Sequence, residues 1–184
     1  MAAADVDEEA QLVSEPTLSA LNVALAKARA VHANTEEIIV AADTLVVVEG
    51  EVLGKPAGEA EARAMLQRLR GRAHQVLTGV VLQQGELTWA AVVATRVELR
   101  DYADADIAAY IARGEPFDKA GGYAIQDATL RPVERLSGCY LNVVGLPLCA
   151  VAAGLTALGA SAEPASAPAC QYCERGRPLV SRSG

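Results

Sequence analysis

Asp43 is the residue whose surroundings point most directly to chemistry. It stands in Ala41-Ala42-Asp43-Thr44, inside the apolar run 38–48. Burial disfavours the charged form of a carboxylate unless the group is paired or binds a cation. Such a position is typical of a general base or of a metal ligand. The structural alternative is an aspartate at a strand end that caps a turn, and position alone does not separate the two.

Two lysines lie in glycine-containing loops where they can meet an anion. Lys55 sits in Gly54-Lys55-Pro56, and Lys119 comes just before Gly121-Gly122, where the missing side chains let a ligand approach the backbone. Gln126 follows this second loop, and its amide both donates and accepts hydrogen bonds, which suits reading the edge of a base. Taken singly, the structural alternatives are a solvated lysine and a glycine turn before a strand.

Acidic residues gather near the N-terminus. Asp5, Asp7, Glu8 and Glu9 offer the hard oxygen ligands that Mg²⁺ and Mn²⁺ prefer. Most acidic runs near a terminus are only solvated, so the cluster alone does not predict a metal site.

A lone Cys-x-x-Cys pair, Cys170 and Cys173, stands near the C-terminus. It supplies half of the ligands of a closed structural zinc site, which needs four. A zinc-linked interaction module is therefore kept as an alternative hypothesis, and metal analysis of the protein would test it.

The composition indicates a globular domain with an acidic surface. The chain has 184 residues, 52% of them hydrophobic and 4% aromatic, which suffices for one aliphatic core. A net charge of −7 argues against binding to a nucleic acid polymer, which needs a basic surface. No apolar run approaches the ~18 residues of a membrane helix. The opening residues lack a signal-peptide pattern, so we expect a cytoplasmic protein without membrane association.

Hydrophobic periodicity predicts the elements that position these side chains. Helices are expected at 17–32, 58–70, 104–113 and 148–158, and strands at 38–48, 75–83 and 87–99. In the first helix, Leu18, Leu21, Leu25 and Ala28 recur at helical spacing and are expected to face inward. The alternation of helices and strands around one long hairpin indicates an α/β fold with a mixed sheet. Residues 159–184 are rich in Ala, Ser and Pro and are expected to form a disordered tail.

Taken together in order, the motifs resemble the Maf (septum-formation) family of nucleoside triphosphate pyrophosphatases. Each motif is weak alone, but the ordered set is specific and spans about residues 5–158. The segments that carry the resemblance are Ala42-Asp43-Thr44, Gly54-Lys55-Pro56, Leu69-Arg70-Gly71, Thr78-Gly79-Val80, Asp118-Lys119-Ala120-Gly121 and Asn142–Leu148.

The resemblance implies an enzyme that hydrolyses a nucleotide between its α- and β-phosphates, which yields a nucleoside monophosphate and pyrophosphate and cleans the nucleotide pool. It also implies a divalent metal cofactor, Mg²⁺ or Mn²⁺. The implied fold is a mixed, curved sheet with flanking helices and a central cleft, similar to that of inosine triphosphate pyrophosphatases. Members of the family are often homodimers.

The resemblance also implies roles for individual residues. Asp43 matches the family's proposed proton acceptor, and Lys27, Lys55 and Lys119 match its active-site lysines. Glu8 matches an acidic residue implicated in metal binding. The sequence does not separate a base role for Asp43 from a metal-binding role.

Two further positions are linked in the family to substrate choice. They are occupied here by Thr44 and Gln126. This pair resembles the subgroup that prefers dTTP and UTP, rather than the one that acts on 7-methyl-GTP.

One element of the family pattern has no counterpart in the sequence. The family opens with a strand followed by a Ser-Pro-Arg-Arg-type loop that cradles phosphate, and no such loop occurs in the 184 residues. We therefore expect an N-terminally truncated Maf-like domain over 1–158 with weak or no activity. A catalytically impaired protein that binds nucleotides or regulates cell division is the alternative.

Overall fold

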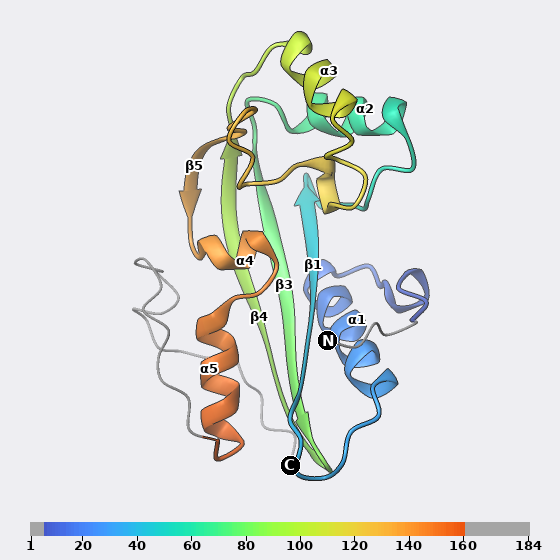
Figure 1. The fold of residues 1–184 in the computed structure, drawn as a ribbon, viewed down its shortest axis with the longest axis vertical. Helices are drawn as coiled ribbons and strands as arrows, with labels where there is room; N and C mark the ends of the chain where they lie inside the picture. Colours follow the sequence, from blue (N-terminus) through green and yellow to red (C-terminus); the bar gives the residue numbers. More distant parts are fainter. Residues whose placement is uncertain (1–5, 161–184) are drawn as a thin grey trace.

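Two long neighbouring strands, β3 (Ala73–Gln84) and β4 (Leu87–Leu99), form the centre of the fold in the computed structural model, which describes residues 6–160 (Figure 1). On one side β3 pairs with β1 (Ile39–Val48), which pairs in turn with the short β2 (Glu51–Leu53). On the other side β4 pairs with β5 (Val133–Ser137). The sheet order is β2-β1-β3-β4-β5.

Every pair of neighbouring strands in this sheet is antiparallel. The predicted α/β class with flanking helices is confirmed, whereas the sequence had favoured a sheet of mixed direction. Turns of two residues join β1 to β2 and β3 to β4, and such short turns permit only antiparallel pairing. Glu49 and Gly50 both adopt positive φ, as the favoured type I′ hairpin turn requires.

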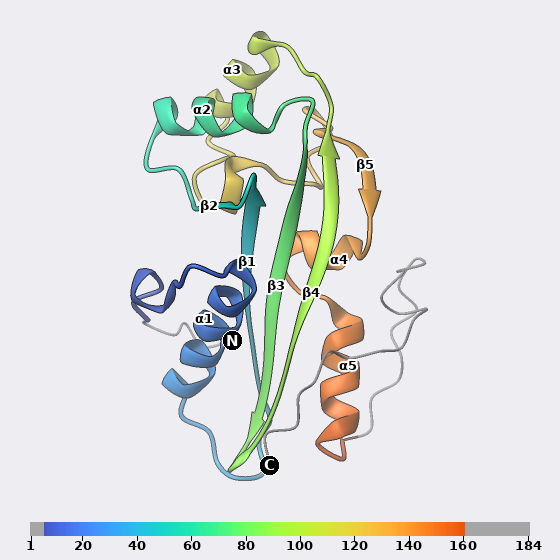
Figure 2. The ribbon, with the colours of Figure 1, turned by 180° about the vertical axis from the view of Figure 1, so that it is seen from behind.

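Helices cover the two faces of the sheet unequally (Figures 1 and 2). One face carries α1 (Pro16–Ala30), which packs on Leu45, Leu77 and Val92. The opposite face carries the remaining helices. They are α2 (Glu59–Leu69), α3 (Asp104–Ala112), the 3₁₀ turn η2 (Ala120–Gly122), α4 (Tyr140–Val144) and α5 (Leu148–Ala157). A further 3₁₀ turn, η1 (Glu9–Gln11), precedes α1.

The buried face of α1 differs from the prediction. Leu18 is 52% exposed, and Leu21 and Leu25 are only partly buried, whereas Ala28 is buried as predicted. The other buried residues of the helix are Ser19, Ala20, Val23 and Ala24. The reason is the close approach of the helix to β3. A Cβ atom built on Gly79 would lie only 2.3 Å from the carbonyl oxygen of Ala20, so only small side chains fit between helix and sheet. With these alanines against the sheet, Lys27 lies at the side of the helix that faces β1, where it contacts Asp43.

The remaining predicted elements agree with the structure to within a few residues. The short β2, β5 and α4 were not predicted as separate elements. Among the described residues, no helix is both long enough and apolar enough to cross a membrane. Most of the predicted tail, including Cys170 and Cys173, lies outside the described residues.

Substitution of Gly79 by alanine tests the close packing of α1 on β3. We expect Gly79→Ala to lower the free energy of unfolding by about 2 kcal/mol or more, because the added methyl group overlaps the backbone of Ala20. Gly58→Ala is the matched control, since a Cβ atom at Gly58 meets no atom within 4 Å. Urea unfolding measures both variants. An unchanged Gly79→Ala protein would show that the helix is not held against the strand.

Candidate functional site

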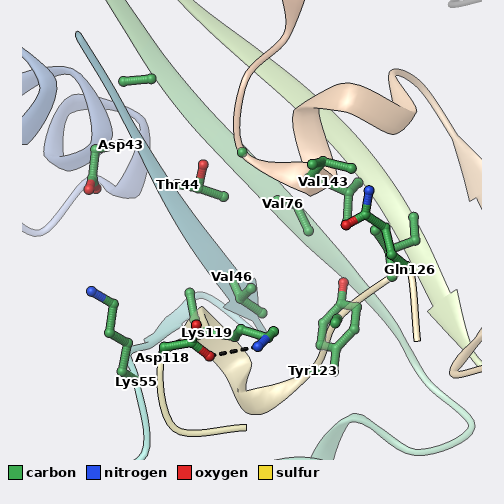
Figure 3. Close-up of a pocket in the computed structure, with 16 residues that line it drawn as sticks. Asp43, Thr44, Val46, Lys55, Val76, Asp118, Lys119, Tyr123, Gln126 and Val143 are labelled. Atoms are coloured by element: carbon green, nitrogen blue, oxygen red, sulfur yellow. Dashed lines mark hydrogen bonds and ion pairs between the residues drawn. The ribbon is translucent and has the colours of Figure 1, made fainter. Parts of the chain in front are cut away.

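A cavity of about 280 Å³ lies beside β1, close to the point where its pairing with β2 begins at Val46. Its walls come from β1, the loop after β2, the segment around η2, and the end of α4 (Figure 3). Five of the residues singled out from the sequence line it: Asp43, Thr44, Lys55, Lys119 and Gln126. The chain thus brings together side chains that are more than 80 positions apart in the sequence.

The pleat of β1 divides the site between the two faces of the sheet. Successive side chains of a strand point to opposite faces. Asp43 therefore points toward the α1 side, where it meets Lys27. Thr44 points toward the side of α4, where it meets Thr78 of β3. Figure 3 shows Asp43 and Lys55 at one end of the cavity and Gln126 and Val143 at the other.

Lys27 holds two carboxylates at the α1 side of the site. Its Nζ atom lies 2.7 Å from Oδ1 of Asp43 and 2.7 Å from Oε1 of Glu8. The Asp43 side chain is only 10% exposed, so it needs this partner. Burial opposes the charge of Lys27, but the hydrogen bonds to Asp43 and Glu8 outweigh it and raise the pKa of the lysine. Glu8 and Lys27 do not line the cavity themselves. They are connected to it through Asp43, which lines the cavity and pairs with Lys27.

The second cationic part of the site is at Lys119. Its Nζ atom donates to the Asp118 carboxylate at 2.6 Å and to the carbonyl oxygen of Glu115 at 2.8 Å. The hydrogen bond from Lys119 lowers the pKa of Asp118. Lys55 is exposed and lies near Asp118 in the same part of the cavity (Figure 3), where its charge also contributes to lowering the pKa of that aspartate. The two lysines predicted from the loop glycines therefore share one cavity.

A buried histidine lies behind the cavity and was not predicted as part of it. His74 is 3% exposed, and its Nε2 atom lies 2.7 Å from the hydroxyl oxygen of Tyr123, which lines the cavity. Burial lowers the pKa of His74 to about 4, against a smaller opposing effect of the Arg72 backbone. The two rings also meet edge to face. The two residues are 49 positions apart, so no local sequence pattern indicates that they touch.

The acidic side chains fit a divalent cation only in part. Within residues 6–160, no group of three or more His, Cys, Asp and Glu side chains is placed to hold a metal ion. Glu8 and Asp43 nevertheless converge on one cation, the Lys27 ammonium group. Mg²⁺ is commonly held by one or two carboxylates together with substrate phosphates. The oxygen donors of this pair suit that mode of binding.

Fold and site together define an α/β protein with a cleft beside β1 of an antiparallel sheet, lined by lysines, carboxylates and hydrogen-bonding side chains. Comparison with known families is more specific. The chain belongs to the family described as Maf-like protein, whose model matches residues 1–158.

Curated relatives of this chain include three bacterial proteins named dTTP/UTP pyrophosphatase. That of Symbiobacterium thermophilum is 46% identical over 160 residues, which are 86% of this chain and 82% of the relative. That of Geobacter sulfurreducens is 46% identical over 162 residues, 86% of this chain and 84% of the relative. That of Thermomicrobium roseum is 59% identical over 110 residues, which are 60% of this chain and 50% of the relative.

The buried His74 predicts a pH dependence of stability. In the folded protein its pKa is about 4, against 6.5 for an ordinary histidine. Between these values the unfolded chain binds more protons, so the free energy of unfolding falls as the pH is lowered from 6.5 toward 4. The expected loss is about 3 kcal/mol over this window. Urea unfolding at pH 7 and pH 5, between which about 2 kcal/mol of this loss falls, measures it.

The control for this experiment is a second histidine. We expect His74→Gln to reduce the pH dependence and His32→Gln, at an exposed position, to retain it. Equal slopes for wild type and His74→Gln would contradict the assignment of the effect to His74.

Proposed function

We propose that the protein hydrolyses nucleoside triphosphates, dTTP and UTP in particular, to the nucleoside monophosphate and pyrophosphate. The observation that carries the proposal is the convergence of Asp43, Lys55 and Lys119 on one cavity that also contains Thr44 and Gln126. The names of the relatives support the same reaction and the same substrates.

In the proposed reaction Asp43 is the proton acceptor. Water attacks the α-phosphorus, its proton passes to the Asp43 carboxylate, and pyrophosphate leaves with the electron pair of the broken P–O bond. Lys27 supports this role because it holds the carboxylate in one orientation through a 2.7 Å contact. Lys55 and Lys119 face the same cavity and would bind the oxygens of the polyphosphate.

The charge balance of the site supports a divalent cofactor, Mg²⁺ or Mn²⁺. Three lysines stand against four carboxylates in the ion pairs and the cavity, which leaves a formal charge of −1. The residues are Lys27, Lys55, Lys119, Glu8, Asp43, Glu115 and Asp118. A site of this charge does not by itself attract a polyphosphate. Glu8 and Asp43 would hold the cation, which when bound neutralises phosphate charge.

The substrate's base would occupy the opposite end of the cavity. There Thr44 and the exposed Gln126 supply hydrogen-bonding groups beside the apolar Val76 and Val143. An amide and a hydroxyl next to apolar side chains are the means by which a pocket reads one base and covers its faces. Figure 3 shows Gln126 and Val143 close to each other on this side.

The proposal extends to the setting in which the protein works. We place the activity in the cytoplasm, where nucleoside triphosphates are made and used, and in a Maf-like domain over 1–158. A homodimer is the expected assembly, and exposed apolar side chains at Tyr140, Val144, Leu146 and Leu148 offer a surface for it.

Replacement of Asp43 tests the proposed reaction. We expect Asp43→Asn to lower pyrophosphate release from dTTP and UTP to the uncatalysed background, even where the wild-type rate is itself weak, because the amide cannot accept the proton. Asp101→Asn is the matched control, since Asp101 is 90% exposed and does not line the cavity. Release is measured with Mg²⁺ or Mn²⁺, and an excess of EDTA should abolish it.

The same measurements decide between the enzyme and the alternative of a nucleotide-binding regulator. Calorimetry measures nucleotide binding, and phosphate detection measures turnover. Binding of dTTP or UTP without turnover above that of Asp43→Asn would favour the regulator, whereas turnover that disappears with Asp43→Asn supports the enzyme.

A further inference from the structure

A chain of buried hydrogen bonds leads from the cavity into the core of the protein. Thr44 Oγ1 lies 2.9 Å from Thr78 Oγ1, and Thr78 Oγ1 lies 3.1 Å from the carbonyl oxygen of Asn142. Thr78 and Asn142 are completely buried, whereas Thr44 is half-buried and lines the cavity. These hydrogen bonds thus connect a residue that lines the cavity with two residues that are buried behind it.

The single proton of each hydroxyl group fixes the direction of this chain. The Asn142 carbonyl oxygen can only accept a hydrogen bond, so the Thr78 hydroxyl must donate to it. Thr78 then has no proton left for Thr44. The Thr44 hydroxyl must therefore donate to Thr78, since the opposite arrangement would set two acceptor atoms against each other at 2.9 Å.

The position of Asn142 keeps this direction from reversing. Its Nδ2 atom donates to the carbonyl oxygen of Val76 at 3.0 Å and to Thr95 Oγ1 at 3.0 Å. Thr95 Oγ1 in turn accepts from the backbone N–H of Cys139 and donates to its carbonyl oxygen. These contacts tie the Asn142 side chain to β3 and β4. The backbone carbonyl oxygen of the same residue therefore stays in place beside Thr78.

We propose that Thr78 acts as a positioning residue that makes Thr44 a hydrogen-bond acceptor toward the cavity, so that the pocket selects bases with a ring N–H group. This inference rests on the proposed function. Thymine and uracil share an imide N–H between two carbonyl groups, which Thr44 Oγ1 can accept. Cytosine carries an unprotonated nitrogen at the same ring position, so it meets the Thr44 oxygen with a second acceptor.

Binding of UTP and CTP tests the proposal without dependence on turnover. Titration calorimetry uses the full chain carrying Asp43→Asn, so that no hydrolysis accompanies binding. We expect UTP to bind at least 30-fold more tightly than CTP. Thr78→Val should lower this ratio at least 10-fold, because the Thr44 hydroxyl is then free to donate to the cytosine nitrogen. Thr78→Ser, which retains the hydroxyl group, should restore the ratio.

Tyr102→Phe is the matched control for structural damage. It removes a buried hydroxyl group that donates to the carbonyl oxygen of Leu66, and Tyr102 takes no part in the cavity lining or in the chain of hydrogen bonds from Thr44 to Asn142. We expect a loss of stability and an unchanged ratio of UTP to CTP affinity. An equal change of the ratio in Tyr102→Phe and Thr78→Val would overturn the specific role of Thr78. So would an unchanged ratio in a folded Thr78→Val protein.

A modified nucleotide tests the same idea without any change of Thr78. UTP methylated at the ring N–H has lost the donor, and we expect it to bind at least 30-fold more weakly than UTP. Equal binding would overturn the proposal even if Thr78→Val fails to fold. The outcomes remain distinct from those of the hydrolysis test: selective binding without turnover by the wild-type chain contradicts only the proposed enzyme, and turnover without selectivity contradicts only the role of Thr78.

Discussion

The pleat of β1 is the constraint on which the rest of the site depends. Because neighbouring residues of a strand point to opposite faces, Asp43 and Thr44 serve two different environments one residue apart. Asp43 faces the charged side with Lys27, and Thr44 faces the buried hydroxyl groups of β3. A shift of β1 by one residue against β3 would exchange the two environments. The long register between β1 and β3, from Ile39 to Val47, prevents such a shift.

The helix on one face of the sheet gives this strand its charged partner. Gly79 admits the backbone of α1 so closely that alanines form the contact, and Lys27 is left at the margin next to Asp43. On the other face, η2 and α4 form the walls that close the cavity around Thr44. Each wall is a short segment that contains a glycine with positive φ, Gly121 in η2 and Gly145 after α4. A Cβ atom at Gly121 would lie 2.9 Å from Cγ1 of Val46, so a side chain does not fit there.

Much of this could be predicted from the sequence, and the failures have physical causes. The long elements and the ordered motifs were found because hydrophobic periodicity and glycine positions are local signals. The face of α1 was predicted only in part: Ala28 is buried as expected, but Leu18 is exposed because the close approach of the helix to Gly79 favours alanines at the contact. The strand β5 has only five residues, none of them buried, and thus carries little pattern.

The missed parts of the site have a different cause. The pairing of Glu8 with Lys27, the contact of His74 with Tyr123, and the path from Thr44 to Asn142 all join residues distant in the sequence. No spacing within one segment encodes such contacts. The resemblance to the family supplied Glu8 and Lys27 as isolated positions, and the structure added that they touch each other and Asp43.

The ammonium group of Lys27 serves as a built-in counter-ion, and this has a consequence for how a ligand is received. The carboxylates of Glu8 and Asp43 are compensated before any ligand arrives, so the charged end of the cleft is assembled in the resting protein. A ligand that enters therefore does not have to order these side chains, and little of its binding energy is lost in doing so. A divalent cation held by Glu8 and Asp43, as proposed above, would have to displace the Lys27 ammonium group, so its binding would be a competition between two cations.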